Sequence, residues 1–169
     1  MTPVSDLLTH VLAGYVLATL ASWRIDWLRP RHVPLAMLGS ALPDAAKVHL
    51  VAGGVRTTVA GVEVSWLALQ TVGGALSLAA IGVLLVPRRE RRPVSAVLVG
   101  GVLVHVALDY FVIRAGGRAP PSLYPLSWVQ LPAGNLYLSS DVWPALVALA
   151  VATTVWVLDR RRDTSGSTA

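Results

Sequence analysis

The sequence predicts an all-α integral membrane protein, with about five transmembrane or re-entrant helices packed in one bundle. Of its 169 residues, 54% are hydrophobic and only 14% are charged, whereas soluble domains carry about 25% charged residues. The mean hydropathy is +0.63. The apolar residues gather in segments, and about 20 such residues cross a hydrocarbon core of about 30 Å. We expect one helical membrane domain over residues 1–160 and a disordered polar tail over residues 161–169.

The first two apolar segments differ in how cleanly they would cross a membrane. The first covers about residues 7–23 and follows an N-terminus without the basic residues of a signal peptide, so we expect a retained helix. The second covers about residues 33–55, but Pro43, Asp44 and Lys47 interrupt it. Proline and ionisable residues are unfavourable inside a membrane helix. The second segment therefore either spans the membrane or is re-entrant.

The last three apolar segments are separated by polar sequence. Residues 64–86 are the most uniformly apolar, residues 94–113 carry His105 and Asp109, and residues 142–158 end at a run of arginines. The polar stretch between the last two segments contains several prolines and glycines, which are typical of loops. We predict three further helices, with a long loop over residues 114–141.

Arginines gather in three groups at the ends of the apolar segments, at residues 24–31, 88–92 and 160–162. Five spans place all three groups on the same side, which the positive-inside rule makes the cytoplasm. We therefore predict a multi-pass protein of the inner or plasma membrane, with its N-terminus outside and its C-terminus cytoplasmic. Because this topology accounts for the net charge of +5, we predict no nucleic-acid partner.

Ionisable side chains inside apolar segments are the main candidates for function. Each costs roughly 2.5–3.5 kcal/mol at the centre of a membrane helix, so such residues are functional by default. Two pairs have the spacing of neighbours on one helix face, and the predicted orientation brings three segments to a similar depth near the outer side. The candidates are Asp6 and His10 in the first segment, Asp44 and His49 in the second, and His105 and Asp109 in the fourth.

Imidazole and carboxylate groups together suit a divalent metal ion such as Zn²⁺, Mn²⁺ or Fe²⁺. The chain has no cysteine, so thiolate ligands are excluded. Other roles remain open for the same residues. Asp44 follows Pro43 and could cap a helix, Asp6 suits a helix start, and a bond between His105 and Asp109 could join helices.

Four short motifs, in order over about residues 6–128, resemble those of the inner-membrane metal-dependent hydrolases, the group that includes the LexA-regulated membrane hydrolase. The first is similar to a Thr-His…Gly start, the second to a Gly…Pro-Asp motif, the third to a Gly…His-x-x-x-Asp helix, and the fourth to a Tyr/Trp-Pro-hydrophobic-Ser stretch. Here they read DLLTHVLAGYVLA, LGSALPDAAK, GGVLVHVALDYFV and SLYPLSW.

The resemblance implies a membrane-bound metal-dependent hydrolase with His10, Asp44, His105 and Asp109 as metal ligands. The chain departs from the family in two places. Ala45 and Ala46 follow the Pro-Asp motif, where the family usually has a second acidic residue. The family's His-Arg…Thr-His-Ser motif has no counterpart, because the corresponding stretch, residues 55–74, contains no histidine.

We expect hydrolysis of a phospho- or acyl-ester near the outer face, with a membrane lipid as partner and a lipid or small ester as substrate. Asp109 or Asp44 would be catalytic, as general base toward the attacking water. Two alternatives stay open: an inactive structural or interaction protein on the same scaffold, and a small proton-coupled transporter. The absence of an internal repeat disfavours the transporter.

Overall fold

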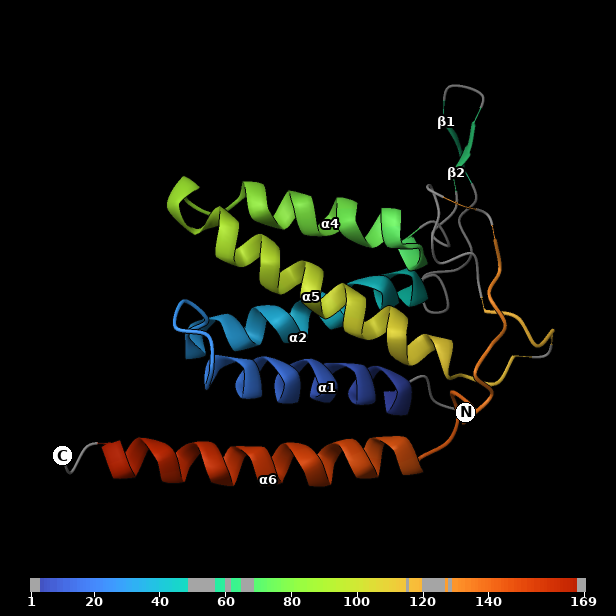
Figure 1. Ribbon diagram of the computed structural model, residues 1–169. Coiled ribbons are helices and arrows are strands. Elements are labelled where there is room, and N and C mark those ends of the chain that lie inside the picture. The colour runs from blue at the N-terminus through green and yellow to red at the C-terminus, as the bar shows by residue number, and fades with distance from the viewer. Residues whose placement is uncertain are drawn as a thin grey trace.

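The computed structural model describes residues 4–48, 57–59, 62–64, 69–114, 116–119, 127 and 129–166. In these ranges the chain forms five α-helices, three 3₁₀ helices and one β-hairpin. The α-helices run side by side, with α4 and α6 on opposite outer sides (Figure 1). In chain order the elements are α1 (Val4–Ser22), η1 (Pro30–His32), α2 (Val33–Ala41), η2 (Leu42–Val48), β1 (Thr57–Val59), β2 (Val62–Val64), α4 (Val72–Leu84), η4 (Arg88–Glu90), α5 (Arg91–Tyr110) and α6 (Trp143–Gly166).

The inner helices α1, α2 and α5 pack closely because small residues lie between them. A Cβ atom at Gly39 of α2 would lie 2.5 Å from the backbone oxygen of Leu98 on α5. A Cβ atom at Gly14 of α1 would lie 2.6 Å from Oγ of Ser40 on α2. Small residues let membrane helices approach backbone to backbone. These two contacts bring α1, α2 and α5 close together, next to the polar cluster described below.

The helical bundle agrees with the predicted fold class, but only part of it has the length of a membrane span. Within the described ranges, two helices are long and apolar enough to cross a membrane, at Arg88–Tyr110 and Trp143–Arg162. Asp6–Ser22 and Val72–Leu84 are shorter apolar helices. Helix α6 exposes large apolar side chains over its length, including Leu146, Leu149 and Trp156. Such an apolar face indicates contact with lipid or with another protein.

The second predicted segment does not form one continuous α-helix. Helix α2 ends at Ala41 after 9 residues and the chain continues as the 3₁₀ helix η2. Pro43 causes the break, because it has no N–H group for an α-helical hydrogen bond and its ring clashes with the preceding turn. The remainder of this predicted segment lies outside the described residues.

The predicted start of the third segment at residue 64 is wrong. Val62–Val64 pairs in antiparallel register with Thr57–Val59, so this stretch is the second strand of a hairpin. Helix α4 begins at Val72, where Oγ1 of Thr71 accepts a hydrogen bond of 3.1 Å from the Gly74 N–H group. The β-branched residues on both sides of the hairpin favour strands. With 13 residues, α4 is about 20 Å long, which is shorter than a hydrocarbon core.

The last predicted boundary also differs from the structure. Helix α6 continues to Gly166, so residues 161–166, which we predicted as disordered tail, are helical. Extending an existing helix by a few residues requires far less free energy than starting one. Oγ1 of Thr164 donates to the backbone oxygen of Arg161 at 2.9 Å, within this extension. Residues 167–169 lie outside the described part.

The three arginine-rich stretches meet at one end of the bundle. Arg31 contacts Glu90 at 3.2 Å, which joins the first stretch to the second. The guanidinium of Arg162 lies 4.8 Å from the centre of the Trp23 ring, and Nε1 of Trp23 donates to Asp159 at 2.6 Å. Helix α1 begins and helix α6 ends at opposite ends of the bundle (Figure 1). Which end faces the cytoplasm remains a prediction.

Candidate metal centre

Two buried histidines stack at the end of the bundle opposite the three arginine-rich stretches. The rings of His10 on α1 and His105 on α5 are stacked with centroids 4.0 Å apart. The two residues are 0% and 3% exposed. Nδ1 of His10 lies 2.7 Å from the backbone oxygen of Asp6, and Nδ1 of His105 lies 2.7 Å from that of Ser40. A carbonyl oxygen only accepts, so each Nδ1 carries the hydrogen. In the neutral imidazole, each Nε2 then presents a lone pair, which is the usual arrangement of a metal ligand.

The contact between Ser40 and His105 depends on the break between α2 and η2. Ser40 lies in the last turn of α2, where carbonyl groups lose their helical partners. In the 3₁₀ pattern, its carbonyl would accept from the residue three positions on, which is Pro43 and has no N–H group. Pro43 therefore leaves the Ser40 carbonyl available to orient the imidazole of His105.

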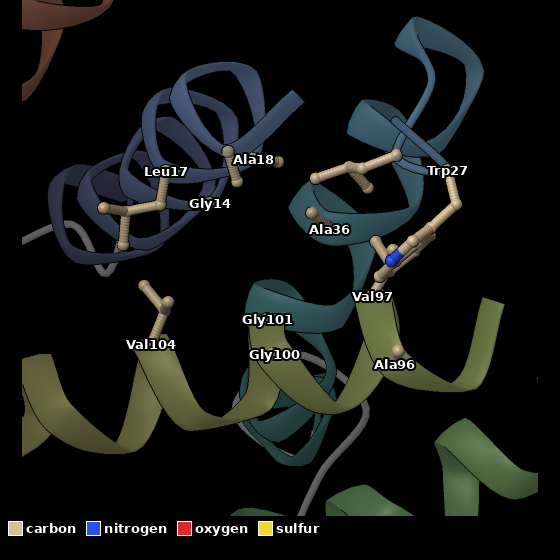
Figure 2. A pocket seen from close by; sticks show the side chains of 12 residues that line it. Gly14, Leu17, Ala18, Trp27, Ala36, Ala96, Val97, Gly100, Gly101 and Val104 are labelled. Atoms are coloured by element: carbon tan, nitrogen blue, oxygen red, sulfur yellow. The ribbon is translucent and has the colours of Figure 1, made fainter. Parts of the chain in front are cut away.

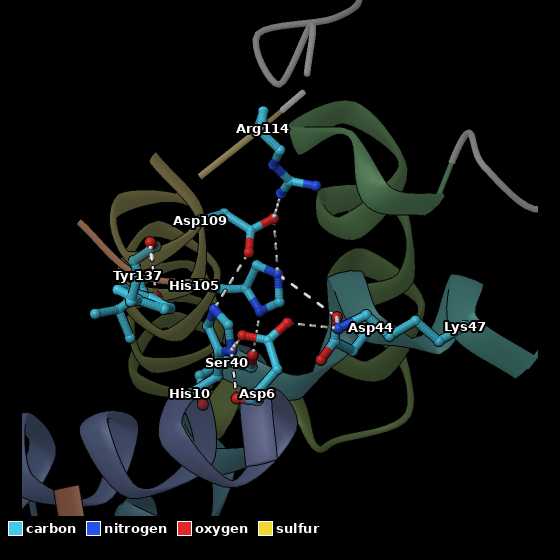
Figure 3. A network of polar contacts seen from close by, with 10 residues as sticks. Asp6, His10, Ser40, Asp44, Lys47, His105, Asp109, Arg114 and Tyr137 are labelled. Atoms are coloured by element: carbon cyan, nitrogen blue, oxygen red, sulfur yellow. Dashed lines mark hydrogen bonds and ion pairs between the residues drawn. The ribbon is translucent and has the colours of Figure 1, made fainter. Parts of the chain in front are cut away.

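Two carboxylates approach the Nε2 atoms at distances that suit ligands of one ion. His10 Nε2 is 3.5 Å from Asp109 Oδ1, and His105 Nε2 is 3.7 Å from Asp109 Oδ2 and 3.8 Å from Asp44 Oδ1 (Figure 3). Hydrogen bonds of this type are about 2.7–3.2 Å long. Two ligands at about 2.1 Å from a tetrahedral zinc ion lie about 3.4 Å apart. The distances from Nε2 to the carboxylate oxygens are therefore too long for good hydrogen bonds. They are close to the distance between two ligand atoms of one metal ion.

Several buried polar atoms at this place lack a hydrogen-bond partner within the described part of the chain. They are His10 Nε2, Asp44 Oδ2 and Asp6 Oδ1. Leaving such an atom unsatisfied costs about 1–3 kcal/mol, and a metal ion would satisfy it. Ligand atoms lie within 4.8 Å of one another in two overlapping groups, His10 with Asp44 and His105, and Asp6 with His10 and Asp109. The donor set fits a divalent cation.

The four residues predicted as metal ligands thus come together from three elements: α1, η2 and α5. His49, the candidate histidine of the second segment, lies outside the described residues. Asp6, which we interpreted as a helix-start residue, is only 6% exposed and belongs to the same cluster. The sequence feature that indicates this placement is the four-residue spacing between Asp6 and His10, which puts both on one helix face.

Lys47 is a member of the cluster that the sequence did not identify. Its Nζ atom lies 2.8 Å from Asp44 Oδ1 and 3.0 Å from Asp6 Oδ2, so one ammonium joins two carboxylates. The three-residue spacing between Asp44 and Lys47 is compatible with an ion pair within η2. The contact between Lys47 and Asp6 joins η2 to α1, two elements that are far apart in the chain, so the sequence does not show it.

Arg114 and Tyr137 come from the long polar stretch that follows α5. Nη2 of Arg114 lies 3.4 Å from Asp109 Oδ2. The Tyr137 hydroxyl donates to the Leu108 backbone oxygen at 3.0 Å. Burial, with the nearby carboxylates of Asp6 and Asp109, raises the pKa of Tyr137 to about 12, so its hydroxyl keeps its proton. Two described residues of this stretch therefore lie beside the end of α5 that carries Asp109.

A partly open apolar pocket of about 180 Å³ lies elsewhere between α1, α2 and α5. Gly14, Ala36 and Gly101 line it where the three helices meet, and Trp27 and Val104 lie far apart along it (Figure 2). None of the cluster's polar side chains lines it. The candidate centre is therefore the polar cluster, and the pocket is a feature of the helix packing.

Comparison with known proteins agrees with the membrane assignment. A family model described as YdjM inner membrane protein matches residues 6–166, a range that includes every residue of the cluster. Comparisons with curated proteins and with solved structures gave no match. The match extends over nearly the whole chain, so this protein belongs to the YdjM inner membrane protein family.

Proposed function

We propose that this protein is a membrane-bound metal-dependent hydrolase that cleaves a phospho- or acyl-ester, with a membrane lipid as substrate. The observation that carries the proposal is the convergence of two Nε2 atoms and two carboxylates, from three elements, at separations of 3.5–3.8 Å. Polar residues this deep in an apolar bundle are unfavourable without a function. A membrane location is already established by the family.

His10, His105, Asp44 and Asp109 would hold the ion. Zn²⁺, Mn²⁺ and Fe²⁺ all accept a mixture of imidazole and carboxylate ligands. When bound, such an ion supplies Lewis acidity toward a phosphoryl or carbonyl oxygen and lowers the pKa of water. The carbonyls of Asp6 and Ser40 fix both imidazoles in the tautomer that binds a metal.

Asp109 is the best placed of these residues to accept a proton from the attacking water. Its side chain is 26% exposed, whereas that of Asp44 is 6% exposed and is bonded to Lys47. A general base must reach the proton that it removes. We therefore assign the general-base role to Asp109 and a purely binding role to Asp44.

An apolar groove beside the cluster favours a lipid substrate. It has a volume of about 440 Å³ and lies between α1, α6 and the stretch before α6. Thr9 and Leu108, the chain neighbours of His10 and Asp109, line it together with Tyr137, Trp143 and Val147. An acyl chain in this groove would place its polar group at the edge of the cluster.

One observation favours the alternative of an inactive structural protein on the same scaffold. Lys47 and Arg114 already pair with three carboxylates of the cluster. A network satisfied by these cations could join α1, η2 and α5 without any ion. This alternative predicts that the purified protein contains no metal.

Metal content decides between the two. We would purify the full chain in a neutral detergent without added metal and measure bound metals by mass spectrometry, for wild type, H105A/D109A and H32A. His32 is an equally buried histidine outside the cluster, and its Nδ1 accepts from the Arg29 N–H group at 3.0 Å. About one equivalent of metal in wild type and H32A, and none in H105A/D109A, is the expected result for a single site. Wild type without metal would refute the hydrolase proposal.

A further inference from the structure

Two cationic side chains reach the cluster from different elements. Lys47 on η2 bonds Asp6 and Asp44, and Arg114 after α5 bonds Asp109 (Figure 3). Both are partly accessible, since their side chains are 24% and 35% exposed. The carboxylates of Asp6 and Asp44 are only 5% and 6% exposed. The two cations are therefore more accessible than the carboxylates of Asp6 and Asp44 that lie behind them.

The charges of the cluster's carboxylates and cations distinguish between a phosphoester and an acyl ester as substrate. The cluster contains three carboxylates and two cations, so its net charge without an ion is one negative charge. The histidines stay neutral as metal ligands. One divalent ion changes the net charge to one positive charge. An uncompensated charge in a membrane interior is costly, and a substrate with one negative charge would remove it.

We propose that the substrate is a phosphodiester with a single negative charge, as in a phospholipid headgroup, and that Lys47 and Arg114 bind its phosphate. This inference rests on the proposed metal site and narrows its substrate class. A neutral acyl ester would leave the positive charge uncompensated. If Asp44 and Asp109 held an ion, the Arg114 guanidinium would lose its carboxylate partner and Lys47 would keep only Asp6, so both cations would have N–H groups available to phosphate oxygens.

The geometry of Arg114 supports this role. Its contact with Asp109 uses Nη2 at a long 3.4 Å. Its Nε atom is buried and has no hydrogen-bond partner among the described residues. A guanidinium offers parallel N–H groups that match two phosphate oxygens. Arg114 therefore retains the donors that a phosphate would use.

Binding of uncleaved analogues tests the inference without relying on turnover. We would titrate the metal-loaded full chain, in neutral detergent, with dihexyl phosphate and with neutral trihexyl phosphate, by calorimetry. Charge-assisted hydrogen bonds contribute about 1.5–3 kcal/mol, so wild type should prefer the anion by about 10- to 100-fold. K47M and R114M should lose most of this preference. R118M changes an exposed arginine of the same stretch and should keep it.

Dimethyl phosphate distinguishes a lipid from a soluble phosphodiester. Weaker binding of dimethyl than of dihexyl phosphate would support a lipid substrate, and equal binding would support the phosphate site with a soluble ligand. Equal affinity of metal-loaded wild type for dihexyl and trihexyl phosphate would overturn the phosphodiester inference and leave the metal site intact. A wild type without metal would overturn both, and the metal measurement alone would show it.

Discussion

Replacing Lys47 by methionine should destabilise the metal-free protein strongly. Methionine has similar length and no charge, so K47M leaves the carboxylates of Asp6 and Asp44 buried without their shared cation. Breaking a buried ion pair costs about 3–5 kcal/mol. The Lys47 side chain is 24% exposed, and solvent screening reduces the contribution of accessible charges. We therefore expect a loss of about 2–4 kcal/mol in the free energy of unfolding.

The assay is thermal unfolding of metal-free protein in detergent, followed by circular dichroism. For a chain of this size, 1 kcal/mol shifts Tm by about 2–4 °C, so K47M should unfold at least several degrees below wild type. R31M is the control, because the pair of Arg31 and Glu90 is 57% and 25% exposed and should contribute less than about 1 kcal/mol. K47R should recover part of the lost stability. If K47M unfolds no earlier than R31M, the ammonium does not stabilise the buried carboxylates.

Two further predictions concern other parts of the bundle. G39A places a Cβ atom 2.5 Å from the Leu98 backbone oxygen, so α2 and α5 must separate. The free energy of unfolding should fall by about 1–3 kcal/mol. An unchanged Tm for G39A would contradict this close packing. Burial and the adjacent Arg31 lower the pKa of His32. The folded state thus favours neutral His32, and the resulting stability is present above about pH 6.5 and is lost as the pH falls below it. The Tm of wild type should fall more steeply than that of H32N between about pH 6.5 and pH 5, and parallel curves would show that His32 does not contribute.

The long helices could be predicted from the sequence because apolar composition alone determines them. Helices α1 and α5 each largely coincide with an apolar run bounded by polar or basic residues, and α6 contains such a run but continues beyond it to Gly166. Composition failed where a local feature decided the conformation. Pro43 changed the helix type within the second segment, and the pairing of Val62–Val64 with Thr57–Val59 shortened the third.

The candidate site could likewise be predicted from the sequence only in part. His10, Asp44, His105 and Asp109 could be predicted because an ionisable residue in an apolar run is conspicuous by itself. The four-residue spacing also predicted that His105 and Asp109 lie together. The contacts of His10 with Asp109 and of His105 with Asp44 could not be predicted, since they depend on distances across elements. The bond from His105 to the Ser40 carbonyl and the contact of Lys47 with Asp6 depend on how η2 follows α2 and where it places Lys47. Such contacts leave no periodic signal in the sequence.

The position of Lys47 also has a consequence for insertion into the membrane. Asp6 lies in α1 and Lys47 in η2, so both partners of this ion pair precede α5 and α6 in the chain. A carboxylate that enters the membrane with its own cation is much less unfavourable than one that enters alone. Helix α1 can therefore insert with Asp6 neutralised while the later helices are still being synthesised. Only the arrival of α5, with His105 and Asp109, then completes the polar cluster.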